Sequence, residues 1–227
     1  MMLAFFSKTF YDAHFHLRQC ETLNQFKNGE FAYCGCSCAH ETEEFEAQEK
    51  SALDIMSVSP EKKFILAFGI HAQLPLVQNA DFMEKLLEEG RIGAVGEAGF
   101  DLFTDEYKSD IKRQEEAWNI QLELSAKYAK PLVVHCRKAM DRMFRDSKSL
   151  KKLPAVVFHS FAGSVMEAKS LINRGVNAYF SFGKQLLNGD KSAASCVKEL
   201  SENRILLETD APYQTLKGED YTSYTDI

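Results

Sequence analysis

The sequence has 227 residues, 45% of them hydrophobic, and its formal net charge is −6 from 27 basic and 33 acidic side chains. This length suits one large domain or two small ones, and the apolar fraction excludes a globally disordered chain. The acidic balance argues against an extended basic surface that grips a nucleic-acid backbone, although it permits a local site that binds phosphates through metal ions. No apolar run approaches the roughly 20 residues needed to span a bilayer, and the N-terminus lacks a secretory signal pattern. We therefore expect a cytoplasmic protein with reduced cysteines.

An apolar run over residues 3–11 predicts a buried first strand that leads into two histidines, His14 and His16. Side chains two positions apart on a strand point to the same face, so these imidazoles can converge on one point. Neutral imidazole is a common ligand of divalent transition metals, but two ligands alone hold a cation poorly. A metal site therefore requires further His, Asp or Glu side chains from later parts of the chain.

Residues 31–38 predict the second strand, in which Cys34, Cys36 and Cys38 alternate and so share one face. Thiolates bind zinc, but zinc sites usually separate their cysteines by two or more residues. Free cysteines are common in protein cores, so we favour buried structural thiols over a metal role.

Six further strands are predicted from short apolar runs, at residues 64–70, 92–96, 131–134, 155–158, 176–180 and 204–209. Helical segments lie between many of them, at residues 41–57, 81–89, 109–129, 164–174 and 191–203. In the first of these helices, Phe45, Leu53 and Met56 are the expected buried positions. The helix over residues 109–129 has a clear helical period, which predicts one core-facing stripe made of Ile111, Trp118, Leu122, Ser125 and Ala129. Eight strands that alternate with helices predict an α/β fold, a TIM (β/α)8 barrel that forms a single domain over residues 1–227. The alternative is an open doubly wound sheet, although no Gly-rich dinucleotide fingerprint follows the first strand.

Residues of the metal-ligating types follow the predicted strands. Besides the pair after the first strand, they are His71, Glu97, His135, His159 and Asp210. Five of the six histidines in the chain belong to this set, which a random distribution would rarely produce. Because barrel active sites form at the carboxyl ends of the strands, we predict a metal centre at that end.

The predicted metal ligands are His14, His16, Glu97, His135, His159 and Asp210. This set is larger than one tetrahedral zinc ion accepts, so we expect two divalent cations, Zn²⁺, Mg²⁺ or Mn²⁺, with Glu97 as the bridge. Asp210 would bind a cation and take the proton from a bound water, which makes Glu97 and Asp210 the predicted catalytic residues. Arg137, and less directly Lys138 and Arg18, lie near the mouth and would bind a phosphate oxygen.

Several motifs occur in an order and spacing that resemble the TatD family of metal-dependent hydrolases. They are DAHFHL at residues 12–17, GIH at 69–71, GEAGFD at 96–101, PLVVHCR at 131–137, HSFAG at 159–163 and LETDAPY at 207–213. The resemblance runs from about residue 10 to residue 213, nearly the whole chain. It implies an amidohydrolase-like TIM barrel, the same six ligands with Glu97 bridging, and a substrate-lining role for His71.

The resemblance also implies an activity, because members of this family are described as metal-dependent deoxyribonucleases that often act on strand ends. The expected substrate is therefore DNA, at its strand ends. The chain departs from the family pattern at Ala72, Lys138, Ser160 and Ala162, none of which is a predicted ligand. It also stops soon after the eighth strand, without the family's last helix. We therefore expect a shortened C-terminal end with apolar surface exposed on strands eight and one.

Two other functions remain open at this point. The first is hydrolysis of a small-molecule amide or ester at the same metal centre, because function resides in the site and not in the barrel. The second is a metal-binding protein with little turnover.

Overall fold

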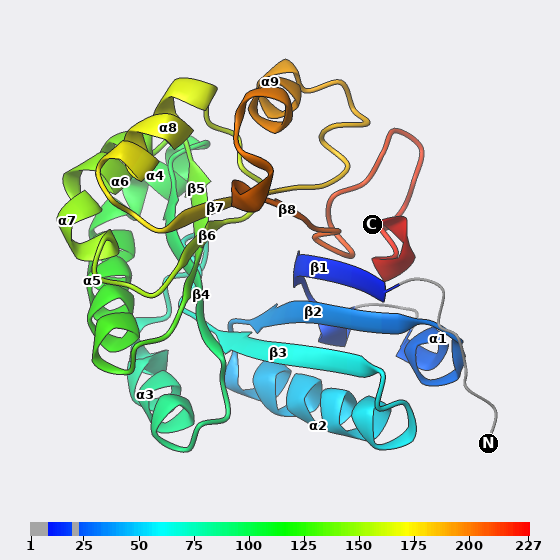
Figure 1. The fold of residues 1–227 in the computed structure, drawn as a ribbon. Coiled ribbons are helices and arrows are strands. Elements are labelled where there is room, and N and C mark those ends of the chain that lie inside the picture. The colour runs from blue at the N-terminus through cyan, green and yellow to red at the C-terminus, as the bar shows by residue number, and fades with distance from the viewer. Residues whose placement is uncertain (1–8, 20–22) are drawn as a thin grey trace.

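Eight parallel strands form the centre of the molecule and follow one another in chain order (Figure 1). The computed structural model describes residues 9–19 and 23–227. The strands are β1 (Thr9–Phe15), β2 (Ala32–Ala39), β3 (Lys62–Phe68), β4 (Ala94–Asp101), β5 (Leu132–Arg137), β6 (Val156–Phe158), β7 (Ala178–Phe182) and β8 (Ile205–Leu207). Each pairs with its sequence neighbours in parallel, and the order never reverses as it does in a doubly wound sheet. The predicted TIM barrel is therefore confirmed.

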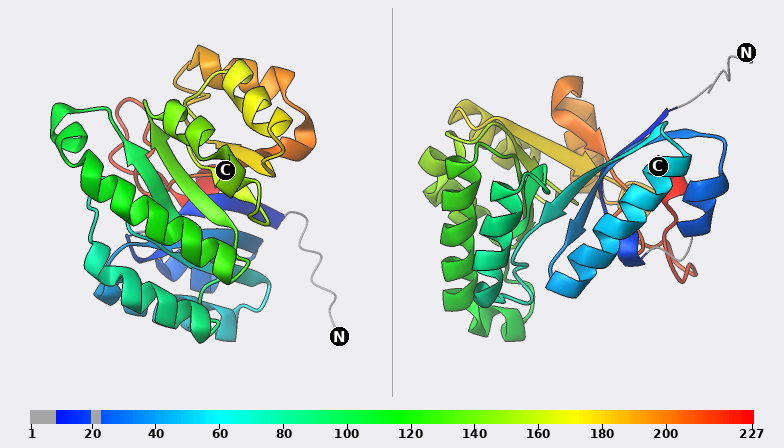
Figure 2. Two further views of the ribbon diagram at one scale, coloured as in Figure 1. Left: turned by 90° about the vertical axis from the view of Figure 1, so that its left-hand side faces the viewer. Right: turned by 90° about the horizontal axis from the view of Figure 1, so that it is seen from below.

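The helices lie outside the ring of strands (Figures 1 and 2). They are α1 (Leu23–Asn28), α2 (Thr42–Val58), α3 (Ala80–Glu88), α4 (Asp105–Ser109), α5 (Ile111–Lys127), α6 (Met140–Arg145), α7 (Ser147–Leu150), α8 (Val165–Asn173) and α9 (Lys191–Glu199). The described residues also contain four 3₁₀ turns, η1 (Leu17–Gln19), η2 (Val77–Asn79), η3 (Glu202–Arg204) and η4 (Tyr224–Asp226). The sequence did not predict α4, α6 or α7, because helices this short show no clear apolar period. Within the described ranges, no helix is both long enough and apolar enough to cross a membrane.

The seam between β8 and β1 is closed by residues that follow β8. The backbone N–H and the hydroxyl of Thr209 donate to the carboxylate of Asp12, over 3.0 and 2.6 Å. The N–H of Asp210 donates to the carbonyl of His14 over 2.9 Å. These bonds hold the residues that follow the last strand against those of the first.

The segment after β8 lies close to β1 (Figure 1). Lys184, which follows β7, anchors this segment through ion pairs with Glu219 at 2.5 Å and Asp226 at 2.7 Å. Tyr11 and Leu207 are 68% and 52% exposed, and both line a hollow at the amino end of the barrel.

The strand boundaries differ from the predicted ones by a few residues, and three strands that continue beyond their predicted ends carry site residues. β1 continues to Phe15, four residues beyond the apolar run, whereas residues 3–8 of that run lie outside the described residues. β4 and β5 also continue, so that Glu97 and His135 lie within their strands and not after them. In each case polar side chains extend the strand because partners inside the barrel satisfy them, which an apolar pattern does not reveal.

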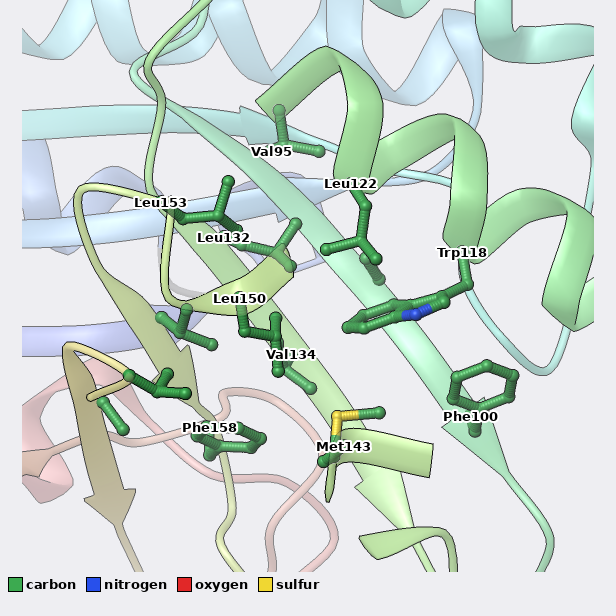
Figure 3. Packing of buried hydrophobic residues seen from close by; sticks show 14 of the residues in the cluster. Val95, Phe100, Trp118, Leu122, Leu132, Val134, Met143, Leu150, Leu153 and Phe158 are labelled. Atoms are coloured by element: carbon green, nitrogen blue, oxygen red, sulfur yellow. The ribbon is translucent and has the colours of Figure 1, made fainter. Parts of the chain in front are cut away.

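The largest core cluster packs α5 against the outer face of β4 and β5 (Figure 3). Trp118 and Leu122, both on the predicted apolar stripe of this helix, are buried there with Phe100 and Val134. The rings of Trp118 and Phe100 lie 5.5 Å apart. Each such buried side chain contributes about 1.5–3 kcal/mol to the free energy of folding. The cluster therefore stabilises β4 and β5, which carry Glu97 and His135.

The buried face of α2 differs from the predicted one. Phe45 is fully buried as expected, but Leu53 is 59% exposed, so its predicted burial was wrong. The helix instead turns Gln48 and Ala52 toward the sheet. Gln48 is buried because its side-chain oxygen accepts a 2.5 Å hydrogen bond from the hydroxyl of Ser37.

Candidate metal centre

The carboxylate of Glu97 lies among imidazoles at the carboxyl end of the barrel, and only 3% of this residue is exposed. Three ring nitrogens face its Oε1 atom, the Nε2 atoms of His14 at 3.4 Å, His16 at 3.4 Å and His40 at 3.1 Å. Three others face its Oε2 atom, His71 Nε2 at 3.6 Å, His135 Nδ1 at 3.7 Å and His159 Nε2 at 2.6 Å. All six histidines of the chain therefore surround one carboxylate, three on each oxygen.

β1 delivers His14 and His16 to the same side of the barrel, as their spacing predicted. Their rings lie 4.9 Å apart at 90° to each other. The register with β2 shifts between Asp12 and Phe15. The carboxylate of Asp12 accepts the N–H of His14 over 3.2 Å and the hydroxyl of Tyr33 over 2.8 Å. Burial raises the pKa of Asp12 to about 7, and these bonds hold the backbone beneath the two imidazoles.

The close approach of β4 to β5 requires a glycine. Gly99 has a φ of +139°, and a Cβ there would lie 2.0 Å from the carbonyl oxygen of His135. The Nε2 atom of His135 lies 3.0 Å from the Asp101 carboxylate, which also accepts a 2.7 Å bond from Gln73. A carboxylate can only accept here, so Nε2 carries a proton and the other ring nitrogen, Nδ1, faces Glu97.

Asp210 follows β8 with a φ of +51°, a conformation that a short polar side chain tolerates better than most. Its Oδ1 atom lies 3.4 Å from His14 Nε2 and 3.7 Å from His16 Nε2. Burial raises the pKa of Asp210 above its usual value. Behind it, the buried carboxylate of Glu208 accepts the N–H and the hydroxyl of Ser160, over 2.6 and 2.7 Å. This network holds the turn that carries Asp210.

The cysteines of β2 occupy the barrel interior as free thiols. The Sγ atom of Cys38 lies 3.5 Å from His14 Nδ1, the ring nitrogen that faces away from Glu97. Burial raises the pKa of the Cys38 thiol well above its usual value, so the thiol is neutral. Cys38 therefore supports His14 from behind, which suits the structural role favoured from the sequence.

The centre contains neutral imidazoles and two rings, His40 and His159, whose pKa the Glu97 carboxylate raises against the effect of burial. Burial lowers the pKa of His14 and His16 to about 4 and that of His71 to about 3, so these rings are neutral at pH 7. Burial also acts against a charge on His159, but the Glu97 carboxylate 2.6 Å away outweighs it and raises the pKa of His159 to about 10. Burial would raise the pKa of Glu97, yet the imidazoles, His159 foremost, hold it well below its usual value.

The donor set fits divalent cations. Among the described residues, four sets of three ligand atoms lie within 4.8 Å of one another, His14–His159–Asp210, His14–Cys38–Glu97, His16–His40–Glu97 and His71–Glu97–His135. The buried Nε2 atom of His14 has no hydrogen-bond partner in the described part of the chain, although it points at two carboxylate oxygens. A buried nitrogen in this position costs about 1–3 kcal/mol, and a cation between it and the carboxylates would satisfy it.

The centre opens into a pocket of about 980 Å³ at the carboxyl end of the barrel. Arg137 lines this pocket, and its guanidinium carbon lies 4.2 Å from the centre of the Phe103 ring. Its Nη1 atom lies 3.7 Å from Asp101, so the side chain is held at the rim. Arg18 lines the pocket as well, whereas Lys138 lines a neighbouring hollow.

The structure brings all eight predicted site residues to this end of the barrel, His14, His16, His71, Glu97, His135, Arg137, His159 and Asp210. His40 was not predicted as a member of the cluster. The signal was present, because His40 directly follows β2 at the same end of the barrel as the predicted ligands. No role was predicted for Asp101 or Glu208, which support His135 and the Asp210 turn.

Known proteins resemble this chain in sequence and in fold. Residues 11–224 match the family described as TatD related DNase. Two curated relatives carry the name 3'-5' ssDNA/RNA exonuclease TatD. The protein from Erwinia billingiae is 34% identical over 141 residues, which are 60% of this chain and 52% of the relative. The protein from Klebsiella pneumoniae is 33% identical over 135 residues, 59% of this chain and 51% of the relative.

The chain thus spans about half the length of these curated relatives. Among solved structures, the Escherichia coli protein YjjV, described as a TatD homolog, has a TM-score of 0.76 and 23% identity. The match covers 96% of this chain and 85% of that protein, and it shows a shared fold.

Proposed function

Because the chain belongs to the family of TatD related DNases, we propose that it is a metal-dependent hydrolase that cleaves phosphodiester bonds of DNA at a two-cation centre. The observation that carries this proposal is the position of Glu97, whose two carboxylate oxygens each face three imidazoles. A carboxylate in this position is suited to bridge two cations.

We assign ligands by the oxygen of Glu97 that each one faces. His14, His16 and Asp210 would hold the cation on the Oε1 side, and His135 and His159 the cation on the Oε2 side. When bound, Zn²⁺, Mg²⁺ or Mn²⁺ supplies Lewis-acid polarisation of a phosphoryl oxygen and a water of lowered pKa. Asp101 and Cys38 contact the outer nitrogens of His135 and His14 and so orient these rings.

Asp210 is the proposed proton acceptor. Its side chain is 16% exposed and faces the pocket, so it can reach a water or substrate oxygen there. Burial raises the pKa of this carboxyl, and a base works best when its pKa approaches the working pH. The hydroxyl oxygen of Ser160, whose proton is donated to Glu208, lies 3.3 Å from Asp210 Oδ2.

Arg137 and His71 are the proposed substrate-binding residues. Arg137 is held at the pocket rim by Phe103, and its guanidinium is suited to a phosphate oxygen. The neutral ring of His71 can donate a hydrogen bond to the same group. A pocket of about 980 Å³ is the size that accepts a small molecule, so a strand end fits it better than a continuous duplex. The name of the relatives adds RNA ends as a second substrate to test.

The test uses the purified chain with Zn²⁺, Mg²⁺ or Mn²⁺ and two forms of DNA, end-labelled linear strands and closed circles. We expect stepwise shortening of the linear strands and intact circles, with the activity lost in Glu97→Gln. Equal cleavage of both forms would overturn the end preference. Equal activity of parent and variant would assign the cleavage to another site or a contaminant.

A second panel separates the alternative functions. It compares p-nitrophenyl phosphodiesters with p-nitrophenyl acyl esters and amides under the same metal loading. Hydrolysis of acyl substrates alone would favour a small-molecule hydrolase. Full metal occupancy without hydrolysis in either panel would favour a metal-binding protein. A cytoplasmic location also remains a proposal, and the five free cysteines that the structure describes agree with it.

A further inference from the structure

His40 has the geometry of a ligand although it lies outside the predicted ligand set. Its Nε2 atom lies 3.1 Å from Glu97 Oε1, closer than the corresponding atoms of His14 and His16 at 3.4 Å. The ligand atoms of His16, His40 and Glu97 all lie within 4.8 Å of one another. The rings of His16 and His40 are 5.7 Å apart. The Nε2 atoms of both rings face the same oxygen of Glu97, Oε1.

The backbone of His40 is fixed on both sides of its Cα atom. Its N–H donates to the Glu44 carboxylate over 2.7 Å, and its carbonyl accepts the side-chain amide of Asn79 over 3.1 Å. Glu44 is itself held by the side-chain amide of Gln19 at 2.7 Å. The His40 side chain is 16% exposed, so it lines the pocket without being free to swing into solvent. The imidazole is therefore positioned before any cation arrives.

We propose that His40 is a metal ligand that completes a three-imidazole set with His14 and His16 on the Oε1 side of Glu97. The inference rests on the proposed metal centre and adds to it a residue and a preference among cations. Three imidazoles with carboxylate oxygens suit Zn²⁺ and similar transition metals. Mg²⁺ prefers oxygen ligands and keeps several waters, so this set disfavours it. The Oε1 position then selects Zn²⁺ over Mg²⁺.

A different role for His40 would leave a different signature. If it only hydrogen-bonds to Glu97, its loss would weaken every cation that this carboxylate binds to a similar extent. If it is a ligand, its loss weakens Zn²⁺ and leaves Mg²⁺ nearly unchanged. The ratio of the two affinities therefore separates a ligand from a positioning residue.

The first experiment measures Zn²⁺ and Mg²⁺ binding by calorimetry in the parent, in His40→Ala and in Leu53→Ala. Leu53 lies on the exposed face of α2, the helix that follows His40, and serves as the matched control. We expect the Zn²⁺ affinity of His40→Ala to be lower than that of the parent by at least about 10- to 100-fold. Losses of this size are typical when a residue that supports a metal ligand is removed, and a ligand should contribute no less. Its Mg²⁺ affinity should stay within about twofold, because Mg²⁺ gains little from imidazole. An unchanged Zn²⁺ affinity, or equal losses for both cations, would overturn the proposal.

The second experiment needs no substitution, so it holds even if His40→Ala fails to fold. The ¹⁵N-histidine-labelled parent is loaded with ¹¹³Cd²⁺, and one-bond ¹⁵N–¹¹³Cd couplings are measured on assigned imidazoles. A coupling on His40 Nε2 would support the assignment. Couplings on His14 and His16 without one on His40 would overturn it. Neither experiment uses nucleic acid, so a failure here is distinct from a failure of the proposed nuclease activity.

Discussion

The two ends of the barrel are lined by the same eight strands, but by different kinds of side chain. At the carboxyl end, a pocket of about 980 Å³ exposes histidines, Glu97 and Asp210. At the amino end lies a second hollow of about 430 Å³, which we name the amino-end cavity. Its lining is almost entirely apolar or small and includes Tyr11, Cys34, Ile65, Val133 and Val157.

The difference shows what each end demands of the sequence. Inward positions of a barrel are usually filled by bulky branched side chains, but Ala13, Gly93 and Ala94 leave the amino-end cavity open. The apolar side chains that line the amino-end cavity need no specific polar partners and tolerate imperfect packing. Buried charges at the other end need specific partners, because an unpaired one would cost several kcal/mol. We therefore expect substitutions at the carboxyl end to affect function strongly and those at the amino-end cavity to affect stability weakly.

The largest effect is expected from Glu97→Gln. The substitution keeps the shape but removes the charge that faces six imidazoles, so we expect nuclease activity to fall by about 10²–10³-fold or more. Bound metal per chain should fall as well, measured by element analysis after dialysis. Glu123→Gln, on the exposed face of α5, is the control and should match the parent in both assays.

Asp210→Asn should have the next largest effect. The variant keeps the polar contacts but loses the proton acceptor, so we expect kcat to fall by about 10²-fold. The cation on the Oε2 side should remain, because His135 and His159 do not depend on Asp210 for their position. Parent-like kcat with reduced metal content would contradict this division of roles.

The pH dependence of metal binding should follow from His159. In the metal-free protein the pKa of His159 is raised to about 10, so the ring is protonated at pH 7 and must lose its proton to bind a cation. Affinity should therefore rise with pH up to about 10, by about tenfold per unit for each proton released. Calorimetry in buffers of different ionisation enthalpy would measure at least one proton released. Binding without proton release would contradict the ion pair between His159 and Glu97.

The smallest effect is expected at the amino-end cavity. Val157→Ile adds one methylene beside open space, so we expect the free energy of unfolding to rise by up to about 0.8 kcal/mol. Val134→Ile is the matched control in the packed core, where the same methylene should destabilise by about 1–3 kcal/mol. Urea unfolding measures both. A loss of nuclease activity in Val157→Ile would show that the two ends of the barrel are coupled.

The fold followed largely from local patterns. Apolar runs located all eight strands, and the helical period of α5 correctly placed Trp118 in the core. The same reasoning was wrong for Leu53, because α2 turns a polar side chain, Gln48, toward a buried hydroxyl. Hydrophobicity predicts burial only where no specific hydrogen bond competes with it.

Local patterns likewise predicted only part of the site. Spacing on one strand was enough to place His14 beside His16, because side chains alternate along β1. The strand pattern also put His40 directly after β2, but the oxygen of Glu97 that it faces depends on the register between β2 and its neighbours, which no local pattern encodes.

The sequence by itself determined the order of the strands and the types of residue that follow them, since both depend on neighbours along the chain. Only the tertiary structure decided which imidazoles share an oxygen of Glu97, and that His40 joins them. Barrel closure sets those distances, because it brings together strand ends that are far apart in the chain.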